Sequence, residues 1–212
     1  MSDRSHQRIV DDLLEQHGHT FAAQAGITLR DKPAPLFQLL VLATLSAAPI
    51  SAEVAAATAH ELFRAGWRTP ERMRAATWQQ RVDALGRGGY RRFDERTATV
   101  LEESAGLLLE RHGGDLRRLR RAADGDLDRL LDALEDLPRV GPSGSRIFAR
   151  EVQAVWPEVA PFFDDRGLDR AGALGLPTDV AELAATVGGD PAEVARLSAA
   201  LVRSALGAGR RG

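Results

Sequence analysis

The sequence comprises 212 residues, of which 44% are hydrophobic and 27% are charged, and its formal net charge is −2. A chain of this length and apolar content can bury the core of one large domain or two small ones. It contains no cysteine, which excludes disulfides, thiolate zinc sites and cysteine-ligated iron–sulfur clusters.

The N-terminus lacks the apolar core of a secretory signal, and the longest apolar run, LLVLATL at 39–45, is too short to span a bilayer. We therefore expect a cytoplasmic protein without a membrane partner. The slight negative charge gives no overall attraction for a polyanion, so a nucleic-acid surface would need a local cluster of cations. The segment 64–96 has such an excess of arginine. This excess is as consistent with solvated helix faces as with a nucleic-acid-binding surface.

Helical periodicity dominates the sequence, and the alternation typical of strands is scarcely seen. The pattern predicts helices near 5–17, 35–47, 52–65, 70–76, 78–86, 93–112, 126–136, 143–155, 164–174, 179–187 and 191–207. The helix at 35–47 is apolar almost all round, as expected for a helix at the centre of a bundle. The predicted fold class is therefore all-α.

The turn LPRVGPSGS joins two of these helices. Leu137 and Val140 can fill the junction between them, while Gly141 permits a tight backbone turn. Gly144 and Ser145 keep the first turn of the next helix slim, and the amides at that helix N-terminus could hold a DNA phosphate. An ordinary connection between two helices has the same composition.

Four motifs in this order give the sequence its resemblance to a known family: LFQLLVLATLSAAPIS, LGRGGYRRFDERTATVLEESAGLLLERHGGDL, DLPRVGPSGS and FFDDRGLDRAGALGLP. From about Leu36 to Pro177 the chain resembles the helix-hairpin-helix DNA glycosylase superfamily, whose best-known member is endonuclease III. DLPRVGPSGS is similar to the family's hairpin Leu-Pro-Gly-Val-Gly. The last motif is similar to its aspartate-bearing segment and the following Leu-Gly-Leu.

The resemblance implies a six-helix barrel at 35–150 that ends in the helix-hairpin-helix at 126–155. It also implies a second helical domain, built from 1–34 and 151–212. Double-stranded DNA would lie across the two domains, with the target base flipped out of the duplex. We expect a monomer that acts in base-excision repair.

The aspartates of the last motif are the candidate catalytic residues. Matching Leu174-Gly175-Leu176 to the family's Leu-Gly-Leu places Asp164, ahead of Asp165, at the catalytic position. Its carboxylate would stabilise the oxocarbenium-like sugar or position the attacking water. Read without the family, Asp164 is a good N-cap for the helix 164–174, and Asp165 favours the helix dipole.

The hairpin departs from the family at three positions. Ser143 stands where bifunctional members have the lysine that forms a Schiff base, so strand cleavage is not expected. Arg139 replaces the glycine before Val140, and Pro142 has no N–H to donate. DNA contacts are therefore expected from the turn as a whole, through Arg139, Gly141, Ser143, Gly144 and Ser145.

The residue that fills the gap left by a flipped base is also changed. Ala48 stands at the position of the family's glutamine, and we consider Arg87 and Tyr90 as replacements, because a cation or a ring can stack on bases. Both fit structural or solvated positions equally well. No cofactor is expected, and the pair His17 and His19 lacks a third ligand for a metal.

Two functions follow from these residues. The first is a monofunctional DNA N-glycosylase with Asp164 as its catalytic carboxylate. The alternative is a catalytically inactive helix-hairpin-helix module that binds DNA or another partner. It predicts that Phe162, Phe163 or Trp156 fills the pocket around Asp164.

Overall fold

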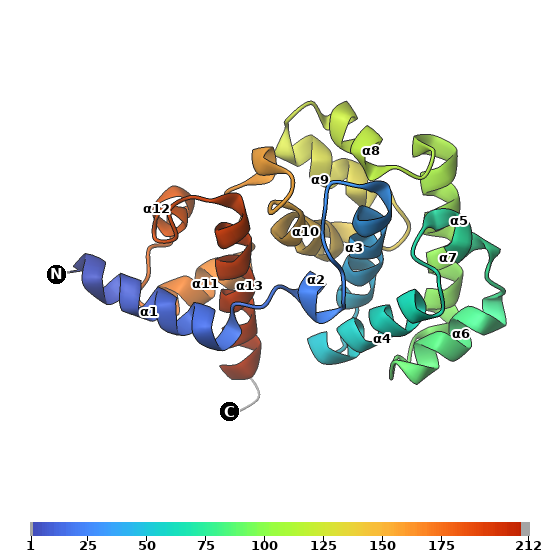
Figure 1. Ribbon diagram of the computed structural model, residues 1–212, viewed down its shortest axis with the longest axis horizontal. Helices are drawn as coiled ribbons and strands as arrows, with labels where there is room; N and C mark the ends of the chain where they lie inside the picture. The colour runs from blue at the N-terminus through green and yellow to red at the C-terminus, as the bar shows by residue number, and fades with distance from the viewer. Residues whose placement is uncertain (1, 209–212) are drawn as a thin grey trace. The chain divides into compact units, whose positions relative to one another are not determined.

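The computed structural model describes residues 2–208. Every regular element in this range is helical, and no strand occurs among these residues (Figure 1). The all-α fold class predicted from the sequence is confirmed. Over the same range, no helix is both long enough and apolar enough to cross a membrane.

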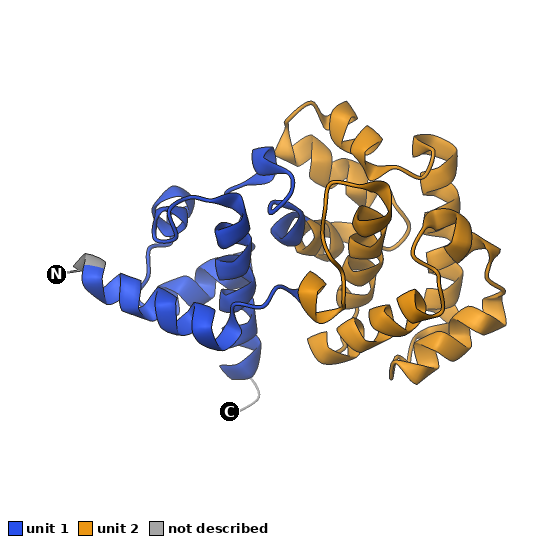
Figure 2. Cartoon of the chain, in the orientation of Figure 1, with its two compact units in different colours: residues 1–21, 149–212 blue, residues 22–148 orange. Residues whose placement is uncertain are grey.

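The chain divides into two compact units (Figure 2). One is formed by both ends of the chain, Met1–Phe21 and Ala149–Gly212, and the other by Ala22–Phe148. The sequence analysis drew the corresponding boundaries at 34–35 and 150–151. We call the two parts the terminal unit and the central unit.

The central unit is built around α3, Pro33–Ser46. Its buried positions cover the whole circumference of the helix, as the apolar run predicts: Leu36, Phe37, Leu39, Leu40, Val41, Leu42, Ala43, Thr44 and Leu45. The unit also contains most of α2 (Phe21–Gln24), α4 (Ala52–Arg64), α5 (Pro70–Ala75), α6 (Trp78–Arg87), α7 (Asp94–His112), α8 (Leu116–Ala123), α9 (Leu127–Glu135) and the start of α10 (Gly141–Val152).

Side-chain caps fix where many of these helices begin. A hydroxyl or carboxylate oxygen accepts a hydrogen bond from a backbone amide in the first turn, which satisfies one of the amides that a helix leaves unpaired. This arrangement occurs at Ser51, Thr69, Thr77, Asp115 and Asp126.

A fully buried arginine joins three helices of the central unit. Arg81 on α6 donates to the carbonyls of Met73 (3.1 Å), Ala76 (2.6 Å) and Ala98 (2.9 Å), and it pairs with the carboxylate of Glu102 on α7. Buried cations need such partners because an unpaired charge is costly to remove from water. Arg81 therefore belongs to the core of this unit.

The terminal unit contains α1 (Ser2–His17), the end of α10, a 3₁₀ turn at Pro157–Val159, α11 (Asp165–Ala173), α12 (Val180–Ala185) and α13 (Pro191–Ala208). The last helix packs against both α1 and α11. The core of the terminal unit is a cluster of buried apolar side chains from these helices and the loops between them: Val10, Leu13, Phe163, Ala171, Leu176, Leu183, Ala184, Val194, Leu197, Ala200 and Leu201.

The predicted helices match the observed ones closely, with three corrections. The short helix α2 was not predicted. The sequence analysis missed α8, where Leu116, Leu119 and Ala123 are buried at helical spacing between four arginines. It also extended the second hairpin helix to residue 155, whereas α10 ends at Val152. The amides of Val155 and Trp156 both donate to the Val152 carbonyl at 2.8 Å, and this tighter turn ends the helix.

Candidate active site and hairpin

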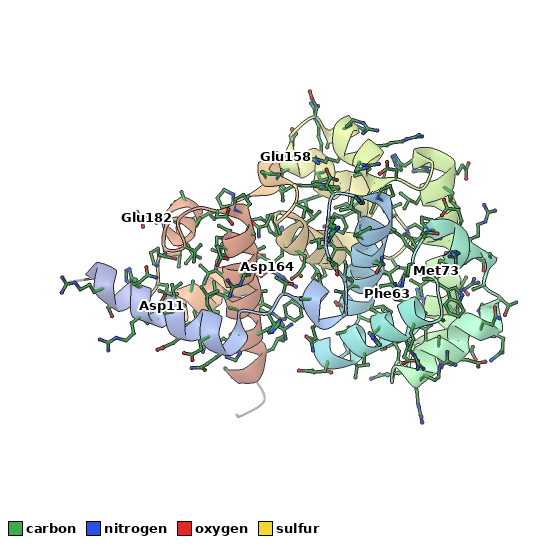
Figure 3. The ribbon with its side chains drawn as sticks, viewed as in Figure 1. Asp11, Phe63, Met73, Glu158, Asp164 and Glu182 are labelled. Carbon is green, nitrogen blue, oxygen red and sulfur yellow. The ribbon has the colours of Figure 1, made fainter. Side chains whose placement is uncertain are left out.

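Asp164 caps the N-terminus of α11 and is held by both of its carboxylate oxygens. Its Oδ1 accepts a hydrogen bond from the amide of Gly167 at 2.9 Å, and its Oδ2 lies 2.6 Å from Nη1 of Arg150. The Asp164 side chain is only 13% exposed, and that of Arg150 only 5%. The capping role that the sequence suggested for Asp164 is confirmed, and the carboxylate lies among the helices of the terminal unit (Figure 3).

Arg150 lies within a buried cluster of charges in this unit. Its Nε is 3.7 Å from Oε1 of Glu151, a residue whose side chain is 1% exposed. The guanidinium carbon is 4.8 Å from the centre of the Phe21 ring. The guanidinium of Arg203 lies 4.1 Å from the centre of the same ring, so that two cations contact one aromatic side chain.

The loop before Asp164 is fixed by the buried side chain of Gln153. Its Oε1 accepts from the amide of Phe162 at 2.9 Å, and its Nε2 donates to the carbonyls of Phe162 and Arg150, both at 2.9 Å. The backbone two residues ahead of Asp164 is therefore tied to the helix that carries Arg150. Both partners of the ion pair have a defined position.

The other residues considered near Asp164 have different surroundings. Asp165 is exposed in the first turn of α11. Phe163 is buried in the core of the terminal unit and Trp156 is fully buried, whereas Phe162 is partly exposed.

The hairpin between α9 and α10 has two residues with left-handed backbone. Arg139 has φ +61° and Gly141 has φ +54°. Glycine adopts such angles readily, but a residue with a Cβ pays roughly 1–2 kcal/mol. Arg139 thus has a glycine-like conformation, while Leu137 and Val140 are buried beneath the turn as the sequence predicted.

The first turn of α10 separates buried from exposed residues. Gly144 is buried, and a Cβ there would lie 3.1 Å from Cγ1 of Val140, so only a slim residue fits. Ser145 is fully buried, and its hydroxyl donates to Oε1 of Glu135 at 2.8 Å. Arg139 and Ser143 are exposed.

Few backbone amides in this turn are available for an anion. The amide of Gly144 donates to the Val140 carbonyl at 3.0 Å, and Pro142 has none to offer. This leaves the amides of Gly141 and Ser143 as the candidate phosphate donors of the hairpin.

Arg139 shares a small pocket with two other residues singled out from the sequence, Ala48 and Tyr90. The pocket has a volume of about 120 Å³. Tyr90 is 2% exposed, and its hydroxyl donates to the carbonyl of Leu45 at 3.2 Å. Burial raises the pKa of this phenol above its ordinary value, an effect that the Thr97 side chain and Arg139 only partly offset.

Arg87 lies away from this group, on the wall of a different pocket of about 320 Å³. Its Nε is 3.3 Å from the carboxylate of Glu61, which also pairs with Arg64 at 3.2 Å. Desolvation of Glu61 acts against ionisation, but the two arginines outweigh it and hold the pKa of that carboxyl below its ordinary value. Arg87 and Tyr90, the two candidates for filling the space that a flipped base would leave in the duplex, thus line different pockets.

Sequence reasoning missed Arg150, Glu151 and Phe21. The one local sign was that Arg150 and Glu151 interrupt an otherwise apolar stretch of α10, where charged residues need partners. Over the described residues, no group of three or more histidine, aspartate or glutamate side chains is arranged to hold a metal ion.

Comparisons with known proteins support the fold. No protein-family model matches the chain. No curated protein matches it either. Among solved structures, the chain is similar to endonuclease III in a trapped covalent intermediate with DNA, an estranged-adenine complex, with a TM-score of 0.55 and 17% identity over 95% of this chain and 85% of that one. The chain therefore has the helical fold of endonuclease III.

Proposed function

We propose that this protein is a monofunctional DNA N-glycosylase, which flips a damaged or mismatched base from double-stranded DNA and hydrolyses its glycosidic bond. It would act as a cytoplasmic monomer in base-excision repair, without a cofactor. The observation that carries the proposal is the carboxylate of Asp164, held in one orientation at the start of α11 in a chain with the endonuclease III fold.

Asp164 has the chemistry that base removal needs. As the glycosidic bond breaks, positive charge develops on the sugar, and a fixed carboxylate stabilises that charge or aligns the water that attacks it. Asp165 follows directly and is exposed, so it stays the second candidate for the same role.

Ser143 defines what the reaction would leave behind. A serine hydroxyl cannot form the imine through which an amine nucleophile leads to strand cleavage. The expected product is an intact abasic site in an unbroken strand.

The hairpin is the part of the proposed enzyme that holds the DNA backbone. The amides of Gly141 and Ser143 and the exposed guanidinium of Arg139 can contact phosphate oxygens, which positions the duplex without reading its bases. Gly144 and Ser145 would act indirectly, because both are buried and shape the turn. Of the two candidates for contacting bases, Arg87 is the accessible one, because its side chain is 51% exposed whereas Tyr90 is 2% exposed.

A single-turnover assay tests the proposal. Wild type, Asp164→Asn and Asp165→Asn would be incubated with duplexes that carry uracil, oxidised pyrimidines, alkylated purines or mismatched adenine or thymine, and each sample would then be treated with alkali. Base release by the wild type and by Asp165→Asn, but not by Asp164→Asn, is the expected result. Strand cleavage that borohydride traps would contradict the assignment of Ser143.

One observation favours a second candidate, a module that binds DNA without catalysis. Both carboxylate oxygens of Asp164 are already engaged, and the side chain is only 13% exposed. If no duplex loses a base while DNA binding is retained, the protein is this binding module.

A further inference from the structure

Arg150 places a buried positive charge directly against the carboxylate of Asp164. It is a buried cation whose Nη1 is 2.6 Å from the Asp164 carboxylate and whose Nε is 3.7 Å from the Glu151 carboxylate. The Nε makes no hydrogen bond within the described chain. The guanidinium thus meets Asp164 at hydrogen-bond distance, whereas its contact with Glu151 is a longer ion pair without a hydrogen bond.

Phe21 supports Arg150 from the other end of the chain. Its ring lies 4.8 Å from the Arg150 guanidinium, a distance at which a cation and an aromatic face attract each other. The segment that carries Phe21 is anchored: its amide donates to Glu151 at 3.3 Å, and Nε of Arg203 donates to the carbonyl of His19 at 2.7 Å. The ring is thus a fixed platform for Arg150.

We propose that Arg150 is the positioning residue of Asp164 and that Phe21 holds Arg150 in place. This inference rests on the proposed function, because it assigns roles in the same reaction. The amide of Gly167 holds Oδ1 of Asp164 through a single hydrogen bond, which alone is a weak restraint on rotation of the carboxylate about its bond to Cβ. The contact of Arg150 with Oδ2 fixes the plane of the carboxylate, and the developing charge on the sugar then meets a preorganised anion.

The test compares the rate of base release with DNA affinity. Arg150→Met removes the cation at similar length, Arg150→Lys keeps the charge without the planar fork, and Phe21→Leu removes the ring but keeps an apolar side chain. Arg166→Met is the matched control, since Arg166 is an exposed arginine on α11. Thermal unfolding establishes which variants are folded.

A positioning role predicts a specific pattern. Arg150→Met lowers the single-turnover rate constant by about 100-fold, the typical effect of misplacing a reacting group, while the Kd for DNA stays unchanged. Arg150→Lys restores part of the rate, Phe21→Leu gives an intermediate loss, and Arg166→Met releases base at the wild-type rate. Should Arg150→Met be unfolded, Arg150→Lys and Phe21→Leu carry the same comparison.

A double variant distinguishes a positioning role from general loss of structure. In the Asp164→Asn background, followed over incubations long enough to measure its residual base release, Arg150→Met should cause no further loss of rate, because Arg150 acts only through the carboxylate that is already gone. A further loss there, or an unchanged rate in Arg150→Met alone, would overturn the inference while leaving the proposed function intact. Wild-type inactivity on every duplex would instead overturn both.

Discussion

The hairpin and the Asp164 cluster differ in how their polar groups are used. At the hairpin, Arg139 and Ser143 are exposed at a turn whose backbone is partly strained. Around Asp164, the charged side chains of Arg150 and Glu151 are buried and face one another. Under the proposed function, DNA affinity would depend on the hairpin and base removal on the Asp164 cluster, so substitutions should affect one without the other.

The largest expected effect is on stability at the Asp164 cluster. Asp164→Ala should lower the free energy of unfolding by about 3–5 kcal/mol, because it leaves Arg150 as a buried cation without its closest partner and removes a helix cap. Urea denaturation measures the loss. The control is Asp169→Ala, an exposed change on the same helix, which should stay within about 0.5 kcal/mol of the wild type. Equal losses in the two variants would mean that the ion pair of Asp164 with Arg150 does not stabilise the fold.

Two serines in the first turn of α10 should differ in how much they contribute to stability. Ser145→Ala should destabilise by about 1–3 kcal/mol, since it leaves the Glu135 carboxylate without the hydroxyl that donates to it at 2.8 Å. Ser143→Ala, two residues away and exposed, should change stability by less than about 0.5 kcal/mol. If the two substitutions lower the free energy of unfolding equally, the hydrogen bond from Ser145 to Glu135 does not stabilise the turn.

Replacing Arg139 by glycine should raise folding stability and lower affinity for DNA. Arg139→Gly relieves the left-handed strain and should stabilise the protein by about 0.5–1 kcal/mol after the flexibility of glycine is counted. The same change should reduce the slope of log affinity for DNA against log salt by about 0.9, the effect of one lost phosphate contact. Arg139→Ala is the control: it should weaken DNA binding equally but give no gain in stability.

The smallest expected effect is a shift in one titration. Tyr90 is the sole tyrosine among the 212 residues, so ultraviolet absorbance follows its phenol alone. Burial raises its pKa in the folded protein, and the midpoint should lie above that of the unfolded chain. The stability that this group contributes is present below the unfolded pKa and is lost as pH rises through the folded one.

Arg139 also acts on this titration. Its charge partly lowers the pKa of Tyr90, so Arg139→Gly should move the midpoint further upward. An unmoved midpoint would mean that the pocket shared by these two residues does not form in solution.

The sequence was most informative where structure depends on neighbouring residues. The apolar run of α3, the hairpin turn and the cap at Asp164 all follow from local patterns, and the structure has them at the predicted places. The arrangement around Arg150 could not be derived this way. Phe21 and Glu151 are 130 positions apart, and Arg203 is 184 positions from His19, so no periodicity or spacing relates them.

The terminal unit is assembled from two segments that lie far apart in the sequence, and this affects the order in which the protein folds during synthesis. Because α1 packs against α13, the ribosome completes the central unit while α1 still lacks this partner. Domains generally fold as units during synthesis, the earlier ones first. An unfinished chain can therefore display the hairpin turn before the surroundings of Asp164 exist, and the base removal proposed for that residue would have to wait until α13 has been made.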